Sequence, residues 1–383
     1  MLVRQFSAHG GLELYAHKVV EGLLASGVAV TVVCQENSSE LQAANLSFRM
    51  LEPEAKGAGK FRRLKNLFSA ANHVLSELAS SVDLVHSQHC PTSKADLVTF
   101  HNHSTKRLSE VGLWWEAALN DCKRRIVPAY HLRDQQDEYL LRSAKCLIFP
   151  AEVMKDDFFS AYPFLQGPPA KPYVVAHPGA ALQDAFVSVA GGAASSTDAG
   201  RFNFLFVGRG FRKKGLDILL SACKILKEKT KQPFSLSIAG LSAKPADKLR
   251  LNLLGLDKIV NYLGFQKDMD AVYAGASAII LPSRVEPFGM APVQAMQRGL
   301  VPIVSRVSGV AEVLHDGQDS LILQNHLDAD ELAGLMLRLM TDNEFLKRLS
   351  SQSRETASRV SWESTVSQTM KAYEIALSLK KNG

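Results

Sequence analysis

Short apolar segments alternate with longer amphipathic segments along almost the whole chain, and this alternation limits the fold more than any other feature. The short segments are rich in β-branched and aromatic residues and end in polar or turn residues, as buried parallel strands do. They span 28–34, 84–87, 96–100, 146–150 and 173–177, and then 202–207, 235–239, 260–263, 278–282, 302–305 and 320–323. Helical patterns separate them, including 12–25, 216–229, 328–340 and 362–379. The sequence therefore predicts parallel sheets covered by helices on both faces, in two doubly wound α/β domains.

A tract rich in glycine, serine and alanine interrupts the alternation near the middle of the chain. Residues 188–200 lack bulky side chains, which is typical of an exposed linker. With 383 residues the chain is long enough for two domains. We expect an N-terminal domain over 1–187, the linker at 188–200, a C-terminal domain over 201–361, and a final helix over 362–383 that crosses back to the first domain.

The composition argues against several classes of protein. No segment contains the roughly 18 unbroken apolar residues that a membrane span requires. The five cysteines are scattered and never form a C-x-x-C pair, which argues against a zinc site or a disulfide framework. The first residues also lack the pattern of a secretory signal peptide. We therefore expect a cytoplasmic protein.

The positive charge is unevenly distributed. Positions 1–190 hold 19 basic and 19 acidic side chains, so the whole excess of +6 lies beyond them and favours anionic ligands in the second half. One basic run in the first half, Lys56, Lys60, Arg62, Arg63 and Lys65, opens an apolar-periodic segment. It predicts either a solvated helix face or peripheral attraction to the inner, anionic face of a membrane. No zinc-finger, helix-turn-helix or RNP pattern accompanies it, so we expect no nucleic acid partner.

A basic loop bounded by glycines follows the strand predicted at 202–207. Residues 208–215 read Gly-Arg-Gly-Phe-Arg-Lys-Lys-Gly and include Arg209, Arg212 and Lys214. Neither a dinucleotide fingerprint nor a P-loop fits the spacing of its glycines and lysines. The loop either neutralises a diphosphate that leaves with developing negative charge or is a solvated strand–helix turn.

The segment 283–296, Ser-Arg-Val-Glu-Pro-Phe-Gly-Met-Ala-Pro-Val-Gln-Ala-Met, is the most informative part of the sequence. Its two prolines suit a helix start, and Gly289 permits a close backbone approach. Glu286 is then expected at the carboxyl end of a strand, beside a helix N-terminus that can hold a phosphate or a sugar hydroxyl. Helix capping is the alternative role for Glu286. Gln294 lies two turns further on and returns to a similar face.

Together, Glu286-Pro-Phe-Gly-Met290, the loop at 208–215 and an N-terminal Gly10-Gly11-Leu-Glu13 segment resemble the retaining GT-B glycosyltransferases of the group 1 (GT4) type. The resemblance covers nearly the whole chain, with the motifs in the family's order. Residues 3–13 are further similar to lipopolysaccharide-core sugar transferases. The resemblance implies two Rossmann-like domains that face each other across a cleft, with the acceptor-binding domain first and the nucleotide-sugar donor-binding domain second.

The resemblance also implies roles for single residues. Arg209 and Lys214 are expected on the donor diphosphate, which Gly10 and Gly11 face from the other domain. Glu286 is expected at the transferred sugar, together with the backbone of the three residues Phe288, Gly289 and Met290. His101, at a strand end, is expected beside the same sugar, and Gln294 beside the ribose. The residues expected to take part in catalysis are Glu286, His101, Arg209 and Lys214.

The sequence departs from the family's pattern at position 294. The family usually has a glutamate there, whose carboxylate is expected to accept hydrogen bonds from both ribose hydroxyls. Gln294 offers one acceptor oxygen and an NH₂ donor instead. We expect a weaker ribose contact and no direct effect on catalysis at Glu286.

Histidines and tryptophans in the first half allow two further hypotheses. The spacing of the histidines at 9, 86, 89, 101 and 103 is compatible with metal ligation, but no H-E-x-x-H pattern is present and the family works without a bound metal, so we expect none. Trp114 and Trp115, followed by Lys-Arg-Arg at 123–125, suit a membrane interface. Burial in helix packing is the fate that we expect for both tryptophans.

These observations lead us to expect transfer of a hexose, with retention, from a nucleotide diphosphate sugar to a hydroxyl of a glycan or glycolipid, in lipopolysaccharide or other cell-surface polysaccharide synthesis. No cofactor is expected. The family implies a front-face route in which the leaving diphosphate assists deprotonation of the incoming hydroxyl. The alternatives are an inactive nucleotide-sugar binding subunit, which Gln294 motivates, and a non-hydrolysing nucleotide-sugar 2-epimerase.

Overall fold

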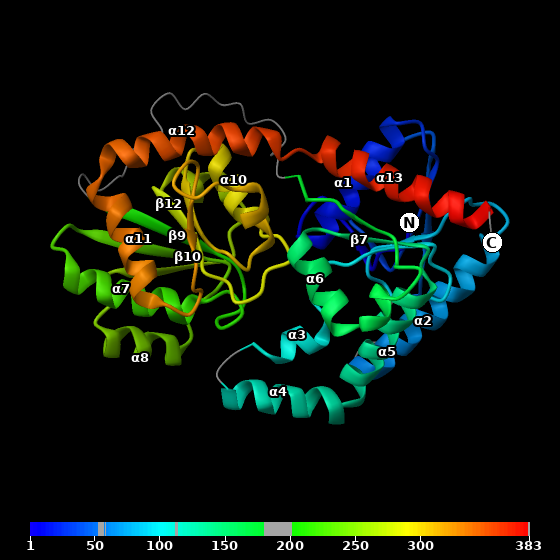
Figure 1. The fold of residues 1–383 in the computed structure, drawn as a ribbon, viewed down its shortest axis with the longest axis horizontal. Coiled ribbons are helices and arrows are strands. Elements are labelled where there is room, and N and C mark those ends of the chain that lie inside the picture. The colour runs from blue at the N-terminus through cyan, green and yellow to red at the C-terminus, as the bar shows by residue number, and fades with distance from the viewer. Residues whose placement is uncertain (53–56, 58, 112–113, 180–200, 382–383) are drawn as a thin grey trace. The chain divides into compact units, whose positions relative to one another are not determined.

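The computed structural model describes residues 1–52, 57, 59–111, 114–179 and 201–381 (Figure 1). The chain divides into two compact units, unit 1 with Met1–Gly179 and Trp362–Gly383, and unit 2 with Ala180–Ser361. The final helix thus lies with the first unit, and the domain end expected at residue 187 lies outside the described residues. The linker expected at 188–200 lies outside the described residues.

Unit 1 combines eight short strands with helices in its described part. The strands are β1 (Gln5–Phe6), β2 (Val30–Cys34), β3 (Glu36–Asn37), β4 (Leu46–Met50), β5 (His86–Ser87), β6 (Leu97–Thr99), β7 (Cys146–Phe149) and β8 (Tyr173–Val175). The helices are α1 (Leu12–Ala25), α2 (Lys60–Glu77), α3 (Thr105–Ser109), α4 (Trp114–Ile126), α5 (Pro128–Ser143), α6 (Glu152–Ala161), the short 3₁₀ helix η1 (Pro163–Gln166) and α13 (Trp362–Lys381).

The N-terminal segment, which the apolar pattern does not single out, forms the centre of the unit 1 sheet. Leu2 makes parallel bridges to Val33 and to Ser87, so it joins β2 to β5. The sheet then runs β4, β2, the segment around Leu2, β5, β6, β7 and β8, all in parallel. The strand order reverses between the Leu2 segment and β5. Sheets of this kind bind their ligands at such a switch point, outside the carboxyl ends of the strands.

Helices cover both faces of the unit 1 sheet, because successive residues of a strand point to opposite sides. Val98 and Leu147 pack against α5 and α6 on one face. Leu97 and Ile148 pack on the other face against Ala372 and neighbouring residues of α13. Strands buried on both sides must be apolar throughout, which is why they read as continuous apolar runs in the sequence.

Unit 2 repeats the same architecture within its described residues. Its strands are β9 (Phe202–Val207), β10 (Phe234–Ala239), β11 (Val260–Gly264), β12 (Ala278–Leu281), β13 (Val301–Ser305) and β14 (Leu321–Leu323). Its helices are α7 (Leu216–Lys229), α8 (Pro245–Leu254), α9 (Met269–Ala274), α10 (Met290–Gln297), η2 (Gly309–Val313), α11 (Ala329–Thr341) and α12 (Asn343–Arg359).

The unit 2 sheet is parallel, in the order β11, β10, β9, β12, β13, β14. The order reverses between β9 and β12, so the loops that follow these two strands meet at the switch point. These are the loops at 208–215 and 282–289, which contain the basic and acidic residues singled out in the sequence.

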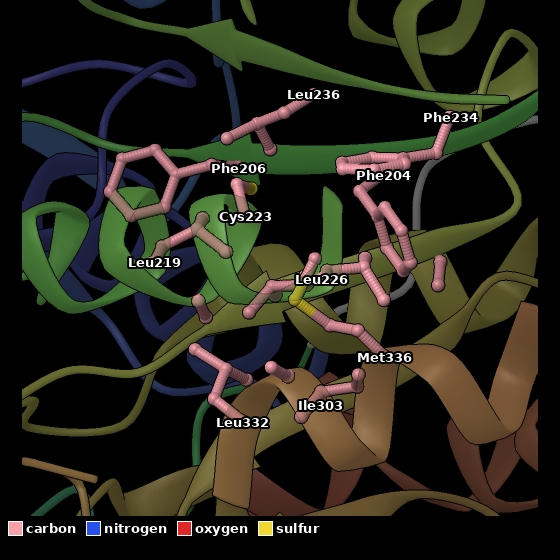
Figure 2. Close-up of a cluster of buried hydrophobic side chains, with 14 of the residues drawn as sticks. Phe204, Phe206, Leu219, Cys223, Leu226, Phe234, Leu236, Ile303, Leu332 and Met336 are labelled. Atoms are coloured by element: carbon pink, nitrogen blue, oxygen red, sulfur yellow. The ribbon is translucent and has the colours of Figure 1, made fainter. Parts of the chain in front are cut away.

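Alternation along β9 builds the core that fixes this edge of the sheet. Phe204 and Phe206 pack against α7 and α11 (Figure 2). Leu205, between them, packs on the opposite face with Tyr273 of α9 and Ala295 of α10. Each such side chain contributes about 1.5–3 kcal/mol when it is buried. The strand end that leads into the loop at 208–215 is therefore held from both sides.

Helix α4 differs from the expectation for its tryptophans. None of its residues is buried, and Trp114 and Trp115 are 85% and 49% exposed. The prediction that they pack inside the protein is wrong, because α4 lies mainly against α3 and α5 and turns this face to solvent. None of the helices in the described part of the chain is long and apolar enough to cross a bilayer.

Helices α1 and α13 approach each other closely at Gly22. A Cβ at this position would overlap a methyl group of Val366. Alanine is favoured over glycine by about 1 kcal/mol in an isolated helix, but the stiff β-branched Val366 cannot turn away, and overpacking costs about 1–3 kcal/mol. We predict that Gly22→Ala lowers the midpoint of thermal unfolding measured by calorimetry.

The control is Gly334→Ala in the middle of α11, where nothing lies within 4 Å of the added Cβ. This variant should raise the unfolding midpoint, since only helix propensity changes. Val366→Ala should destabilise less in the Gly22→Ala background than in the wild type, because it removes the overlap. A Gly22→Ala variant that is stabilised as much as Gly334→Ala would contradict the proposed close packing.

Candidate active site

Two residues from separate loops meet at the switch point of unit 2. Lys214, in the loop after β9, forms an ion pair through its Nζ with Oε2 of Glu286, in the loop after β12. The Oγ of Ser283 donates a hydrogen bond to the same carboxylate oxygen over 3.4 Å. The Lys214 and Glu286 side chains are 21% and 9% exposed. An ammonium and a largely buried carboxylate are thus adjacent at the edge where such sheets bind ligands.

Glycines allow the loop at 208–215 to pass close to the end of β12. Gly208, Gly210 and Gly215 have φ values of +151°, +103° and +72°, which disfavour other residues. Gly215 caps α7, and a Cβ there would collide with the carbonyl oxygen of Pro282. The conformation of Gly215 therefore brings the basic loop against the segment that carries Glu286.

Arg284, which the sequence analysis did not identify, connects the same two loops. Its backbone N–H donates to the carbonyl of Lys213 over 3.0 Å, and its Nη1 donates to the carbonyl of Arg212 over 2.7 Å. Its guanidinium also makes two bonds to the Asp217 carboxylate, of 2.7 and 2.8 Å. Asp217 is the second residue of α7. Because Arg284 and Lys214 are anchored to the same turn, this buried side chain fixes the loop relative to Glu286.

The two arginines of the basic loop lie in different surroundings. Arg212 donates from its Nη1 to Asp217 over 2.8 Å, so its charge is paired within the protein. Arg209 is exposed, and the carbon of its guanidinium lies 5.9 Å from the centre of the Phe265 ring. Among the residues that the structure describes, Lys214 is the basic residue of this loop that forms an ion pair with Glu286.

The backbone of 288–290 lies next to Glu286. Gly289 has a φ of +96°, and a Cβ there would come within 2.9 Å of Leu281 and 3.2 Å of the Glu286 Cγ. The carbonyl of Phe288 accepts a hydrogen bond from Val310 over 2.8 Å. Helix α10 begins at the next residue, Met290. The first N–H groups of a helix have no partner within it, so those of Met290 and Ala291 can serve a polar ligand beside Glu286, whereas Pro292 has none.

Gln294 accepts a hydrogen bond from a residue of another helix, which its position in the sequence does not reveal. The hydroxyl of Tyr273, in α9, donates to the Gln294 Oε1 over 3.2 Å. Burial raises the pKa of Tyr273 above its usual value, so this hydroxyl stays protonated and remains a donor. The Gln294 oxygen therefore accepts one hydrogen bond within the protein and keeps one further lone pair, and its NH₂ group is a donor.

In unit 1, Gly10 and Gly11 lie in the turn that follows the central N-terminal strand. Gly10 has a φ of +105°, and a Cβ there would overlap the Glu13 carboxylate. Gly11 is the N-cap of α1. The two glycines thus bring the N-terminus of α1 to the carboxyl edge of the unit 1 sheet, where a helix dipole favours an anion.

His101 follows β6 at the same edge. Its Nε2 lies 2.7 Å from the Oε1 of Gln88, and its ring packs edge-on against Tyr15 with the centroids 4.9 Å apart. Burial lowers the pKa of His101 well below its usual value, and the nearby His89 and His86 add to the effect. His101 is therefore a neutral imidazole near pH 7.

The other histidines of this edge have protein partners. His86 contacts Tyr373 and Thr99, His89 contacts Asp137, and His103 contacts Asp157. Among the residues that the structure describes, no three histidine, cysteine or acidic side chains are grouped as a metal would need. The sequence offered no way to identify these partners, because most are far away along the chain.

Comparison with known families gives two matches that follow one another along the chain. The model for glycosyltransferase family 4 matches residues 9–180, and the model for glycosyl transferases group 1 matches residues 193–356. An uncharacterized glycosyltransferase of Methanocaldococcus jannaschii is 30% identical over 179 residues, covering 46% of this chain and 49% of that protein. The chain thus matches about half the length of the first curated relatives, or less.

Solved structures agree over nearly the whole chain. The structure of WaaG, a glycosyltransferase involved in lipopolysaccharide biosynthesis, has a TM-score of 0.73 at 16% identity and covers 98% of both chains. The structure of Anabaena HepE in complex with UDP and glucose has a TM-score of 0.61 at 16% identity, covering 97% of this chain and 98% of that one. Both likenesses concern the fold. The two family matches show a family 4 glycosyltransferase domain followed by a group 1 glycosyltransferase domain, and the solved structures show that the chain has the GT-B fold.

Proposed function

We propose that this glycosyltransferase moves a hexose, with retention, from a nucleotide diphosphate sugar to a hydroxyl of a glycan or glycolipid. The observation that carries the proposal is the Lys214–Glu286 ion pair at the switch point of unit 2. In a nucleotide sugar, one bond joins the anionic diphosphate to the sugar. A site that binds both parts therefore needs a cation for the diphosphate next to a hydrogen-bond acceptor for the sugar hydroxyls. The complex of Anabaena HepE with UDP and glucose supports a UDP-hexose donor, and the likeness to WaaG supports a lipopolysaccharide acceptor.

In the proposed reaction, the bond between the anomeric carbon and the diphosphate oxygen breaks, and the acceptor oxygen bonds to that carbon on the same face. The proton of the acceptor hydroxyl passes to the departing diphosphate, whose growing charge Lys214 and Arg209 stabilise. Glu286 and the backbone of Phe288, Gly289 and Met290 position the sugar, and Gln294 contacts the ribose. Gly10, Gly11 and His101 contribute to the same donor from unit 1. The proposal includes no metal ion or cofactor.

Incubation of the purified protein with UDP-glucose and a glycolipid acceptor tests this function. The proposal expects release of UDP together with an α-linked product from the α-configured donor, as measured by NMR. Binding of UDP without turnover of any nucleotide sugar would favour the binding-subunit alternative. A product epimerised at the sugar C2 would favour the epimerase.

Loss of the Lys214 charge should affect turnover more than donor affinity, because the negative charge on the leaving group grows in the transition state. We predict that Lys214→Ala lowers kcat by on the order of 100-fold, the scale of one lost electrostatic stabiliser. Steady-state release of UDP measures the effect. Lys224→Ala is the matched control, since Lys224 is an exposed lysine on α7. Near-normal turnover of folded Lys214→Ala would refute the diphosphate assignment.

A carboxylate at position 294 should improve ribose binding. Glutamate would still accept the Tyr273 hydrogen bond and would keep a second oxygen for the ribose hydroxyls. We predict that Gln294→Glu tightens UDP binding by roughly 5- to 30-fold, with little change in kcat. Calorimetry with UDP at one pH and salt concentration measures this change.

Two results would count against the ribose assignment. Unchanged affinity would mean that position 294 does not reach the ribose. Weaker affinity would mean that another acid already fills the role and repels the new carboxylate. Gln297→Glu, one turn further along α10, is the matched control for the added charge.

We further infer peripheral contact between unit 1 and an anionic membrane. The Nζ of Lys60, at the start of α2, lies 4.5 Å from the centre of the Tyr130 ring in α5. This contact places the basic start of α2 next to the end of α4, where Ile126 is 72% exposed. Basic residues beside exposed apolar side chains favour the interface of an anionic bilayer. Lys56, the first residue of the basic run, lies outside the described residues.

Each basic residue near an anionic surface contributes about 1 kcal/mol, and salt screens this attraction. We predict that the protein sediments with anionic vesicles at low salt and does not sediment with neutral ones. Changing Arg62, Arg63 and Lys65 to serine should abolish the binding. A control with Lys224, Lys248 and Lys258 changed to serine removes the same charge from exposed sites in unit 2. Equal sedimentation of both variants would contradict the inference.

A further inference from the structure

Gln88 lies between two histidines at the carboxyl edge of the unit 1 sheet. It is completely buried. Its Oε1 lies 2.7 Å from the Nε2 of His101, and its Nε2 lies 3.3 Å from the Nε2 of His86. A buried amide must satisfy both its oxygen and its NH₂ group. The direction in which Gln88 points therefore decides which ring nitrogens carry protons.

Met1 favours one of the two directions. The Nε2 of Gln88 lies 3.4 Å from the Sδ of Met1. A thioether sulfur is a weak acceptor and never a donor, so it favours the orientation in which the NH₂ end of Gln88 faces it. The Oε1 then faces His101 and accepts from it. His101 consequently carries its proton on Nε2.

His86 is held in the opposite tautomer. Its Nε2 accepts from the Gln88 amide, and it also lies 2.7 Å from the Oγ1 of Thr99. Its proton is therefore on Nδ1, which donates to the hydroxyl oxygen of Tyr373 over 2.9 Å. Burial lowers the pKa of His86 to about 3, so it does not become an imidazolium near pH 7. The chain of hydrogen bonds thus runs from α13 through His86 and Gln88 to His101.

His89 holds the backbone of His101 independently. The N–H of His101 donates to the His89 Nδ1 over 3.4 Å, so the proton of His89 is on Nε2, which donates to Asp137 over 3.0 Å. His89 has a φ of +54°, a backbone conformation that non-glycine residues rarely adopt. Such strain persists only where the surroundings impose it. Backbone and ring of His101 are thus held by separate partners.

We propose that Tyr373, His86 and Gln88 form a hydrogen-bond relay that holds His101 as the neutral Nε2–H tautomer and so leaves its Nδ1 as an acceptor for a sugar hydroxyl. The residues of the relay are positioning residues, since they act through His101. The assignment of that hydroxyl to the donor sugar rests on the proposed function, whereas the tautomer does not.

Nitrogen NMR of the full chain labelled with ¹⁵N-histidine tests the relay directly. Long-range ¹H–¹⁵N correlation distinguishes the two neutral tautomers and the imidazolium, and His101→Gln identifies the His101 signals by their loss. We expect a single neutral Nε2–H tautomer at His101 from pH 6 to pH 8. An Nδ1–H tautomer or an imidazolium in this range would overturn the relay.

Two variants test control of His101 from a distance. Tyr373→Phe removes only a hydroxyl and leaves the Nδ1 proton of His86 without its acceptor. Transfer of this proton to Nε2 turns Gln88 over against the weak Met1 contact, so a fraction of His101 should gain the Nδ1–H tautomer. Gln88→Leu removes the acceptor itself and should give a mixture of tautomers. Tyr139→Phe, an exposed tyrosine of α5, is the matched control and should change nothing. Unchanged His101 signals in both Tyr373→Phe and Gln88→Leu would refute the relay.

UDP release from UDP-glucose separates the relay from the proposed function. Loss of one hydrogen bond from His101 should lower kcat/KM of Gln88→Leu by about 3- to 10-fold. Tyr373→Phe should lower it in proportion to the fraction of His101 in the wrong tautomer. A shifted tautomer with unchanged kcat/KM would overturn the acceptor role of Nδ1. A wild-type chain with the expected tautomer and no turnover would contradict the proposed function while it supports the relay.

Discussion

The buried contact between Arg284 and Asp217 holds together the part of unit 2 on which the candidate site depends. A parallel sheet brings the ends of β9 and β12 to one edge, but it does not fix the loops that follow them, whose backbone polar groups need partners. Arg284 supplies partners for the carbonyls of Lys213 and Arg212, and its guanidinium is held by the Asp217 carboxylate. Breaking such a pair leaves a buried charge without compensation, which is strongly unfavourable. The geometry of Lys214 and Glu286 is therefore maintained by a neighbouring interaction.

Much of the fold was predictable because it follows from the period of the apolar residues. The strand at Phe202–Val207 and the helices Leu12–Ala25 and Leu216–Lys229 have the boundaries that the pattern indicates. The central strand of unit 1 was not predictable, since the N-terminal segment that pairs with β2 and β5 around Leu2 is too short to show a period. The exposure of Trp114 was missed for a different reason. A helix with aromatic residues looks the same in sequence whether its apolar face meets protein or solvent.

The candidate site was predictable only where its residues lie in local motifs. Lys214 and Glu286 belong to segments with a recognisable pattern of glycines, prolines and charges. Their direct pairing joins positions 72 residues apart, and the bond between His86 and Tyr373 spans 287 residues. Such pairings depend on which helix returns to which face of the sheet, and the tautomers follow from them. No local rule of charge or period contains that information.

The ion pair between Lys214 and Glu286 also couples the binding of the diphosphate to the binding of the sugar in the proposed donor. In the free protein each charge is compensated by the other, so a diphosphate must compete with Glu286 for Lys214. The carboxylate that it displaces is largely buried and needs new hydrogen-bond donors. A nucleotide diphosphate alone offers none at that position, whereas the hydroxyls of an attached sugar supply them. Under the proposed function, this pair should therefore lower the affinity for the free nucleotide and favour the complete nucleotide sugar, and it should form again when the product leaves.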